Sequence, residues 1–242
     1  MDHGKHSIFA RNCCASPRSG ATWLLAEVAL SALTVLLHGP SIVYAQVAPA
    51  AAEIASSGIN VPLADCGAGG AASHSWTVIS DPTALSGAAI EHARTDSIEA
   101  PAALSSCRSI ALKDGDISLR FKPLPGADAT GGLAFRMAGP DDYYLVKIDA
   151  LRDRASLLLV QNGAGEEIVG VDADVTVATW HALTVQVRDE RFTVYLDGTW
   201  IFTGFDKALP HADRLALWAE PGSLIRFDRI TTAPIPRAQS WR

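Results

Sequence analysis

Two alternating segments in the middle of the chain constrain the fold more than any other part of the sequence. In residues 131–137 and again in residues 142–149, apolar side chains alternate with small or polar ones at period two. This is the pattern of a β-strand with one buried face. Residues 138–141, Ala-Gly-Pro-Asp, are typical of a tight reversal, because glycine allows positive φ and proline fixes φ. We therefore predict two central antiparallel strands. The core-facing set is Leu133, Phe135, Met137, Tyr144, Val146 and Ile148, and the opposite face carries Arg136, Lys147 and Asp149.

Short segments of the same kind recur from residue 74 to near the end of the chain. Asn162-Gly163 and Asp197-Gly198 are typical of type I′ hairpin turns. Residues 157–160 form a continuous apolar run, as expected of a strand buried on both faces. About a dozen short strands with turn residues every eight to twelve positions, and no long helical period, predict an all-β antiparallel sandwich.

The N-terminal region predicts export. Basic residues precede a largely apolar stretch at 21–37, and Val43-Tyr44-Ala45 places small residues where a signal peptidase cleaves. We predict a signal peptide over residues 1–45, with an uncleaved membrane anchor as the alternative. Residues 46–73 are rich in alanine and glycine and predict a linker or loosely docked arm. The β-sandwich domain is expected over residues 74–234, followed by a C-terminal tail at 235–242.

Length and charge limit the classes of partner. The 242 residues fit one sandwich domain, since such domains reach about 250 residues. Without residues 1–45, the chain keeps 17 basic and 24 acidic residues and a net charge of −7. An acidic surface without basic clusters argues against nucleic acid and against anionic membranes. No later segment is long and apolar enough to cross a bilayer, so we predict no stable membrane span after signal cleavage and a periplasmic or secreted location.

Two of the four cysteines remain after the predicted cleavage. Cys13 and Cys14 leave with the signal peptide, whereas Cys66 and Cys107 stay. An even pair in an oxidising compartment predicts a Cys66–Cys107 disulfide. Two buried thiols and a lipid anchor on Cys66 are the alternatives, although Asp65 directly before the cysteine argues against lipidation.

Seven strand motifs occur in an order shared with a known family. They are DGDISLRF from Asp114, GGLAFR from Gly131, DYYLVKIDAL from Asp142, WHALTV from Trp180, RFTVYLDG from Arg191, LALW from Leu215 and RFDRI from Arg226. Together they resemble the concanavalin A-like, laminin-G-like jelly-roll domains of exported bacterial proteins. The nearest group is often labelled the 3-keto-disaccharide hydrolase or family-16-like domain. The resemblance covers Trp76 to about Pro234 and implies two curved sheets whose concave face, in many relatives, meets a carbohydrate.

One departure from these relatives affects the C-terminal part of the domain. Where they commonly have Trp-Thr-Lys-Ala-Asp-Ser, this chain has Trp-Ala-Glu-Pro-Gly-Ser over residues 218–223. Gly222 replaces the aspartate and Glu220 replaces the lysine. A role that relatives give to that aspartate is therefore not carried over.

No catalytic residue is predicted. Retaining glycosidases need two carboxylates about 5 Å apart, and in this fold they usually lie on one strand. That spacing is absent, and Asp141-Asp142 and Glu166-Glu167 lie in or just after turns. The histidines lack metal-ligand spacing, and His181 is expected at the edge of the core.

A binding face is a more specific prediction. Period two places several polar and aromatic side chains opposite the core: Arg136, Lys147, Asp149, Trp218 and Glu220. If their strands share the concave sheet, these residues suit a sugar, because aromatic rings stack on its C–H surface and charged groups bind its hydroxyls. An ordinary hydrated sheet face is the alternative. Trp180 and Trp200 are expected to be packing residues.

A structural calcium ion is a further expectation from the resemblance, because jelly-roll relatives often hold one with an aspartate near the last strand. Asp228 occupies that place, and Asp81 is a potential partner. Two carboxylates are few for a cation that takes six to eight oxygen ligands. No other cofactor is expected.

Three functions remain open at this point. The first is an exported, non-catalytic module that binds carbohydrate or another polymer. The second is a glycoside hydrolase or lyase acting on disaccharides or 3-keto-disaccharides, which only the family label suggests. The third is a structural or protein-interaction domain without a small ligand.

Overall fold

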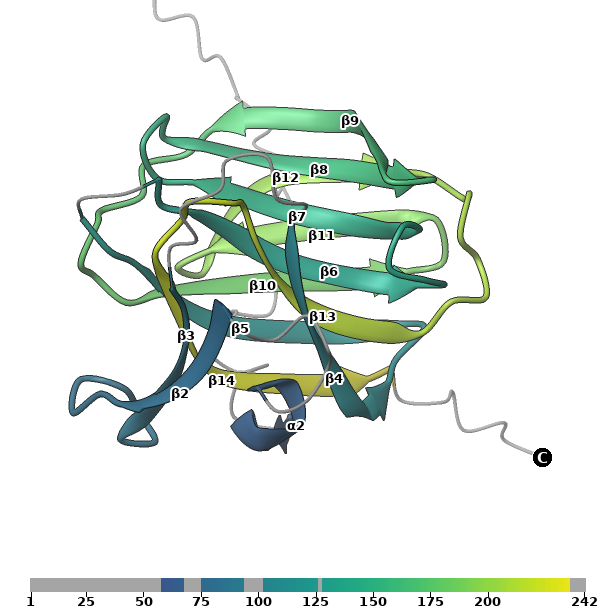
Figure 1. Ribbon diagram of the computed structural model, residues 1–242. Coiled ribbons are helices and arrows are strands. Elements are labelled where there is room, and N and C mark those ends of the chain that lie inside the picture. Colours follow the sequence, from purple (N-terminus) through teal and green to yellow (C-terminus); the bar gives the residue numbers. More distant parts are fainter. Residues whose placement is uncertain (1–57, 68–74, 94–101, 126–127, 236–242) are drawn as a thin grey trace, which may run out of the picture. The chain divides into compact units, whose positions relative to one another are not determined.

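The computed structural model describes residues 58–67, 75–93, 102–125 and 128–235. The predicted signal peptide, most of the predicted linker and most of the predicted tail lie outside these ranges. Within them the chain forms two antiparallel sheets, drawn as stacked layers in Figure 1. This confirms the predicted all-β sandwich.

One sheet has eight strands and the other has six. The eight-stranded sheet has the order β12 (Thr199–Phe205), β11 (Arg191–Leu196), β10 (His181–Arg188), β5 (Gly115–Pro123), β14 (Ile225–Pro234), β3 (Ala88–His92) and β2 (Trp76–Ser80), and β1 (Ile59–Val61) pairs with β14. The six-stranded sheet has the order β4 (Ala103–Ala111), β13 (Arg214–Ala219), β6 (Thr130–Met137), β7 (Tyr143–Asp149), β8 (Arg154–Gln161) and β9 (Ala164–Asp172). The two strands predicted from the central alternation are β6 and β7, which pair with Leu133 opposite Val146.

The main core lies between the two sheets. Phe135 and Tyr144 of the six-stranded sheet stack with their ring centres 5.6 Å apart. Both meet Phe192 of β11, at 5.2 Å and 4.7 Å. Aromatic pairs at such separations stabilise a core beyond the area they bury. The rings therefore join the sheets where the predicted central strands lie.

The two predicted type I′ turns are confirmed. Asn162 and Gly163 have φ values of 51° and 76°, and Asp197 and Gly198 have values of 50° and 80°. Positive φ at both central residues defines this turn, which matches the twist of the strands it joins. The turns close the β8–β9 and β11–β12 hairpins.

The alternation in β6 breaks at Arg136. This residue has φ of 45°, and the pairing of β6 with β13 shifts register there. Such a bulge adds one residue to the strand and changes which face later side chains occupy. Arg136 is therefore only 1% exposed, with its guanidinium 5.3 Å from the Phe192 ring, whereas Met137 lies in the cluster on the other side of the sheet. The predicted faces of Arg136 and Met137 were wrong.

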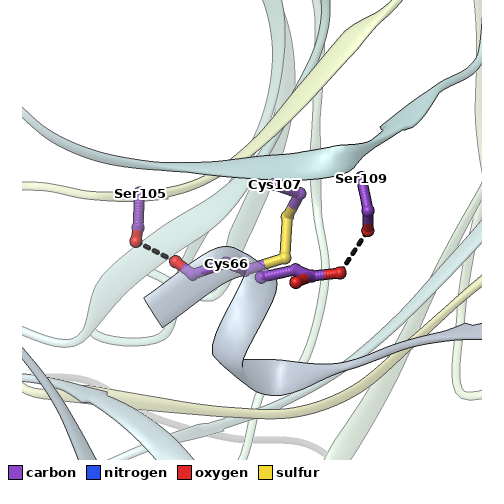
Figure 2. Close-up of a disulfide and its surroundings, with 5 residues drawn as sticks. Cys66, Ser105, Cys107 and Ser109 are labelled. Atoms are coloured by element: carbon purple, nitrogen blue, oxygen red, sulfur yellow. Dashed lines mark hydrogen bonds between the residues drawn. A yellow bond between two sulfur atoms is a disulfide. The ribbon is translucent and has the colours of Figure 1, made fainter. Parts of the chain in front are cut away.

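Residues 58–67, which we call the strap, bridge the two sheets. β1 pairs with β14 of the eight-stranded sheet, and Cys66 in α2 (Leu63–Gly67) is bonded to Cys107 in β4 of the six-stranded sheet. Figure 2 shows α2 against β4, with the Cys66 carbonyl accepting a hydrogen bond from Ser105. The Ser109 hydroxyl donates to the Asp65 carboxylate. The predicted disulfide is confirmed. The strap falls inside the predicted linker but is a strand and a helix with Val61 and Cys66 buried in the core.

Within the described ranges, no helical segment has the length and hydrophobicity that a membrane crossing requires.

His92 gives the fold a pH dependence. The ring is 1% exposed, its Nδ1 lies 2.8 Å from the Ser223 carbonyl oxygen, and burial lowers its pKa below the usual 6.5. The unfolded chain therefore binds a proton more readily, so stability falls as the pH drops below about 6.5. The Asp81 carboxylate, whose pKa Lys122 lowers, stabilises the fold above its unfolded pKa, and this stabilisation is lost only as the pH falls below about 4.

We expect His92→Asn to flatten the stability profile between pH 7.5 and 5.5 (about one unit either side of the unfolded pKa). Asparagine keeps a donor near the Ser223 carbonyl but does not titrate. Urea unfolding at both pH values measures the effect, and each unit by which the pKa is lowered corresponds to about 1.4 kcal/mol. Parallel profiles for the wild type and the variant would contradict it.

Candidate ligand-binding face

The outer face of the six-stranded sheet carries a row of facing side chains. Cross-strand register places Trp218 opposite Gly132, Gly132 opposite Lys147 and Lys147 opposite Ser156. Side chains at directly opposed positions lie about 5 Å apart. Because Gly132 has no side chain, Lys147 extends across it and places Nζ 5.7 Å from the centre of the Trp218 ring. The row thus joins four strands, β13, β6, β7 and β8, into one surface.

A pocket of about 380 Å³ opens on this row. We call it the charged pocket, and its lining is Lys147, Asp149, Arg152, Arg154, Ser156, Leu158, Glu167 and Glu220. Three of the five predicted ligand-binding residues therefore meet there: Lys147, Asp149 and Glu220. The loop position of Glu220, directly after β13, brings its carboxylate to 3.2 Å from Lys147 Nζ.

Trp218 lies outside the lining of the charged pocket but contacts Lys147, which lines it. The side chain is 6% exposed and packs in a second apolar cluster with Tyr143, Leu145 and Val160 on the outer side of the sheet. A ring so little exposed offers no open stacking surface, in contrast to its predicted role. Its contact with Lys147 is a cation–π interaction, which attracts the ammonium to the ring face. Trp218 therefore positions Lys147.

Glu167, Ser156 and Arg154 form another part of the pocket lining and are linked by hydrogen bonds. Glu167 accepts hydrogen bonds from the Ser156 hydroxyl at 2.7 Å and from the Arg154 guanidinium at 2.6 Å. These contacts hold the pKa of Glu167 below its usual value, so this carboxylate stays ionised. Gly170 makes room for the pair, because a β-carbon there would lie 2.3 Å from an Arg154 nitrogen.

Asp149 caps the turn that follows β7. One carboxylate oxygen accepts from the backbone nitrogens of Leu151 and Arg152, each at 3.1 Å, and the other lies 2.6 Å from the Arg152 guanidinium. These bonds fix the loop that carries Arg152 to the pocket. The role of Asp149 is thus to shape the rim.

Arg136 lies apart from the charged pocket. The bulge turns it toward Asp114, at 2.5 Å, and toward the Lys113 carbonyl oxygen, at 3.1 Å. Arg136 and Asp114 form a partly buried structural ion pair, and the prediction that Arg136 shares a face with Lys147 was wrong.

Sequence reasoning missed Arg152, Arg154, Ser156 and Glu167. Alternation does place Arg154 and Ser156 opposite the core-facing Leu157, but the apolar run at 157–160 obscured it by suggesting a strand buried on both faces. Glu167 reaches Ser156 through a register shift between Leu157 and Leu158, where β8 pairs with β9. No local sequence pattern predicts that register shift.

The two predicted calcium ligands are both held by cations. Asp81 lies 2.8 Å from Lys122 and 3.0 Å from Arg226. Asp228 lies 2.8 Å from Arg120 and accepts from the Leu85 backbone nitrogen at 2.7 Å. Ion pairs already balance both charges, and the described ranges contain no cluster of three or more potential metal ligands. The calcium site stays a prediction that these contacts do not support.

Comparison with solved structures identifies the class of the fold. Neither a protein-family model nor a curated protein matches the sequence. Among solved structures, the carbohydrate-binding module CBM66 from Bacillus subtilis has a TM-score of 0.53 at 19% identity, covering 66% of this chain and 95% of that one. The fold is a concanavalin A-like jelly roll. Membership of the 3-keto-disaccharide hydrolase-like group stays a prediction.

Two other solved structures are similar at lower scores. The galectin LEC-6 from Caenorhabditis elegans has a TM-score of 0.44 at 11% identity, covering 55% of this chain and 90% of that one. A prokaryotic β-1,3-1,4-glucanase (lichenase) derived from a mouse hindgut metagenome has a TM-score of 0.44 at 16% identity, covering 66% and 79%. Because one fold can carry many unrelated functions, only the site can indicate what this chain does.

Proposed function

We propose that this protein is an exported carbohydrate-binding module that binds glycan in the charged pocket. The observation that carries the proposal is the position of Lys147, which is held between Glu220 and the Trp218 ring inside a pocket on a sheet face. Similarity to a carbohydrate-binding module supports the fold that this function requires. The predicted signal peptide and the Cys66–Cys107 disulfide support export, because disulfides persist in oxidising compartments.

The chemistry of the lining suits a sugar. Each hydroxyl of a sugar can donate one hydrogen bond and accept others, and the pocket offers donors on Lys147 and Arg154 and acceptors on Glu220 and Glu167. The ion pairs fix the rotamers of these side chains before a ligand arrives, which reduces the entropy lost on binding. The volume of about 380 Å³ is at the lower end of the range for small-molecule sites.

Binding is favoured over hydrolysis by the state of the carboxylates. A glycosidase needs a carboxyl group with a raised pKa to protonate the leaving oxygen. Glu167 has the opposite shift, and Asp149 is occupied by the turn that it caps. We therefore propose a non-catalytic module and expect no release of reducing sugar from a bound glycan.

The test is binding of the purified protein to a broad glycan array, with calcium and with EDTA. We expect a saturable ligand whose Kd rises about tenfold in Lys147→Ala, since one charge-assisted hydrogen bond contributes about 1.5–3 kcal/mol. Trp218→Leu is expected to weaken binding less, because it removes only the support of Lys147.

Arg188→Ala is the matched control. It removes a partly exposed cation–carboxylate pair, 2.7 Å to Asp116, from the other sheet. Binding should be unchanged. An array without any hit under both conditions, or equal weakening by Lys147→Ala and Arg188→Ala, would contradict the proposal. Cleavage of the bound glycan would instead identify an enzyme.

A further inference from the structure

A second pocket lies on the outer face of the eight-stranded sheet. Its volume is about 370 Å³, and it is lined in part by hydroxyl side chains, Ser118, Thr184 and Thr231, and by Arg120, Asp197 and Arg229. We call it the hydroxyl pocket. The type I′ turn at Asp197-Gly198 forms one wall, and the loop carrying Leu85 contributes to another.

A cross-strand row leads from the hydroxyl pocket to two aromatic residues. Register places Thr231 opposite Ser118, Ser118 opposite Thr184, Thr184 opposite Tyr195 and Tyr195 opposite Trp200. The row crosses β14, β5, β10, β11 and β12. Four strand spacings correspond to about 19 Å, a length that suits a chain of several sugar rings better than a single ring.

Trp200 was expected to be a packing residue, but its side chain is exposed. It is 58% exposed, and its Nε1–H donates to Thr203 Oγ1 at 3.2 Å. Thr203 in turn donates to Thr193 Oγ1 at 3.3 Å. The prediction failed because β12 shifts register beside Tyr195, which leaves Trp200 on the outer face. A large exposed ring held by hydrogen bonds is a ready stacking surface for the C–H face of a sugar.

Arg229 provides the pocket with an exposed guanidinium. It is the extra residue of a bulge in β14, with φ of 30°, and its side chain is exposed and lines the pocket. Within the described ranges it has no ion pair or hydrogen bond. Arg120 lies 2.8 Å from Asp228, whereas the Asp197 carboxylate is held by hydrogen bonds with His181 Nδ1 and with the Ala182 backbone nitrogen, each at 2.7 Å. Residues held in sparsely populated φ/ψ regions cluster at ligand sites, and here such a residue presents a guanidinium to the pocket.

We propose that this face is a second glycan site, specific for an oligosaccharide that carries carboxylate groups. Arg229 binds a sugar carboxylate, because a guanidinium matches the planar geometry of that group. The hydroxyl side chains of the pocket accept and donate to ring hydroxyls, and Tyr195 and Trp200 stack on the next rings along the row. The site is independent of the charged pocket, since it lies on the opposite sheet.

The test is an NMR titration of the purified, 15N-labelled protein with oligomers of galacturonate, glucuronate and mannuronate. The readouts are the Trp200 indole signal and the Gly198 amide signal. We expect at least one uronate to shift both signals together. Its fully methyl-esterified form, which has the same rings without the charge, should bind about tenfold more weakly or worse. Added salt should weaken the charged form, because exposed charges are screened.

Two variants locate the site, and one serves as control. Arg229→Gly removes the guanidinium, and glycine accepts positive φ, so the fold is preserved. Arg229→Gly and Trp200→Ala should each raise Kd about tenfold, whereas Lys147→Ala on the other sheet should not change it. If no uronate shifts these signals at millimolar concentration, the proposal is overturned. It is equally overturned if the ester binds as well as the acid, or if Arg229→Gly binds normally.

Discussion

Replacement of Cys66 and Cys107 together by serine is expected to lower the free energy of unfolding by about 4 kcal/mol. The disulfide closes a loop with a sequence separation of 41 residues. A cross-link of that span removes about this much free energy of chain entropy from the unfolded state. The loss is also local, because the bond fixes the strap to β4, whose one neighbour among the described strands of its sheet is β13. Urea unfolding with and without a reductant measures it.

Ser109→Ala is the matched control for the disulfide. It removes the hydrogen bond between Ser109 and Asp65, which also joins the strap to β4, and leaves the sulfur bridge intact. A solvent-exposed bond of this kind contributes about 1 kcal/mol or less. The wild type in reductant should resemble the double serine variant. The expectation fails if the double variant is as stable as Ser109→Ala.

Gly132→Ala is expected to destabilise the protein by about 3 kcal/mol and to abolish binding in the charged pocket. A β-carbon at residue 132 would lie 2.0 Å from the backbone carbonyl oxygen of Val146. Backbone cannot move aside as a flexible side chain can, so β6 and β7 must separate, and overpacking of this kind costs about 1–3 kcal/mol or more. The new methyl group would also stand between Trp218 and Lys147, which lie on either side of Gly132 in the row.

Gly139→Ala is the comparison for this variant. Residue 139 lies in the turn between β6 and β7, and the nearest atom to a β-carbon there is 4.0 Å away, at the end of the Asp142 side chain. The substitution should change stability by less than about 1 kcal/mol. Thermal unfolding of both variants, with glycan binding of each, separates the steric effect from a general loss of glycine flexibility. Similar stability of the two variants would contradict the argument.

Strands in which apolar and polar side chains alternate strictly could be predicted from the sequence. Lys147 and Asp149 face away from Val146 and Ile148, and Trp218 and Glu220 reach the same side of the sheet, because β7 and β13 keep period two there. Period two and turn chemistry are local properties, so a single sequence contains them.

The features that were missed depend on contacts between distant segments. Arg136, Glu167 and Trp200 all lie beside register shifts, and a shift by one residue moves a side chain to the other face of its sheet. The strap was missed because β1 pairs with β14 through backbone groups, which every residue type except proline supplies in full. Composition therefore indicated a linker where the chain forms a strand.

The disulfide also determines how the domain transmits mechanical tension. A pull on the chain before Cys66 passes through the two sulfur atoms into β4 at Cys107, and the segment between the two cysteines carries none of it. β2 and β3 lie within that segment, so they remain unloaded while the strap and β4 bear the force. Load applied to the chain before the strap would thus pass first through the pairing of β1 with β14 and then by a covalent route into β4, without unzipping the eight-stranded sheet from its β2 edge.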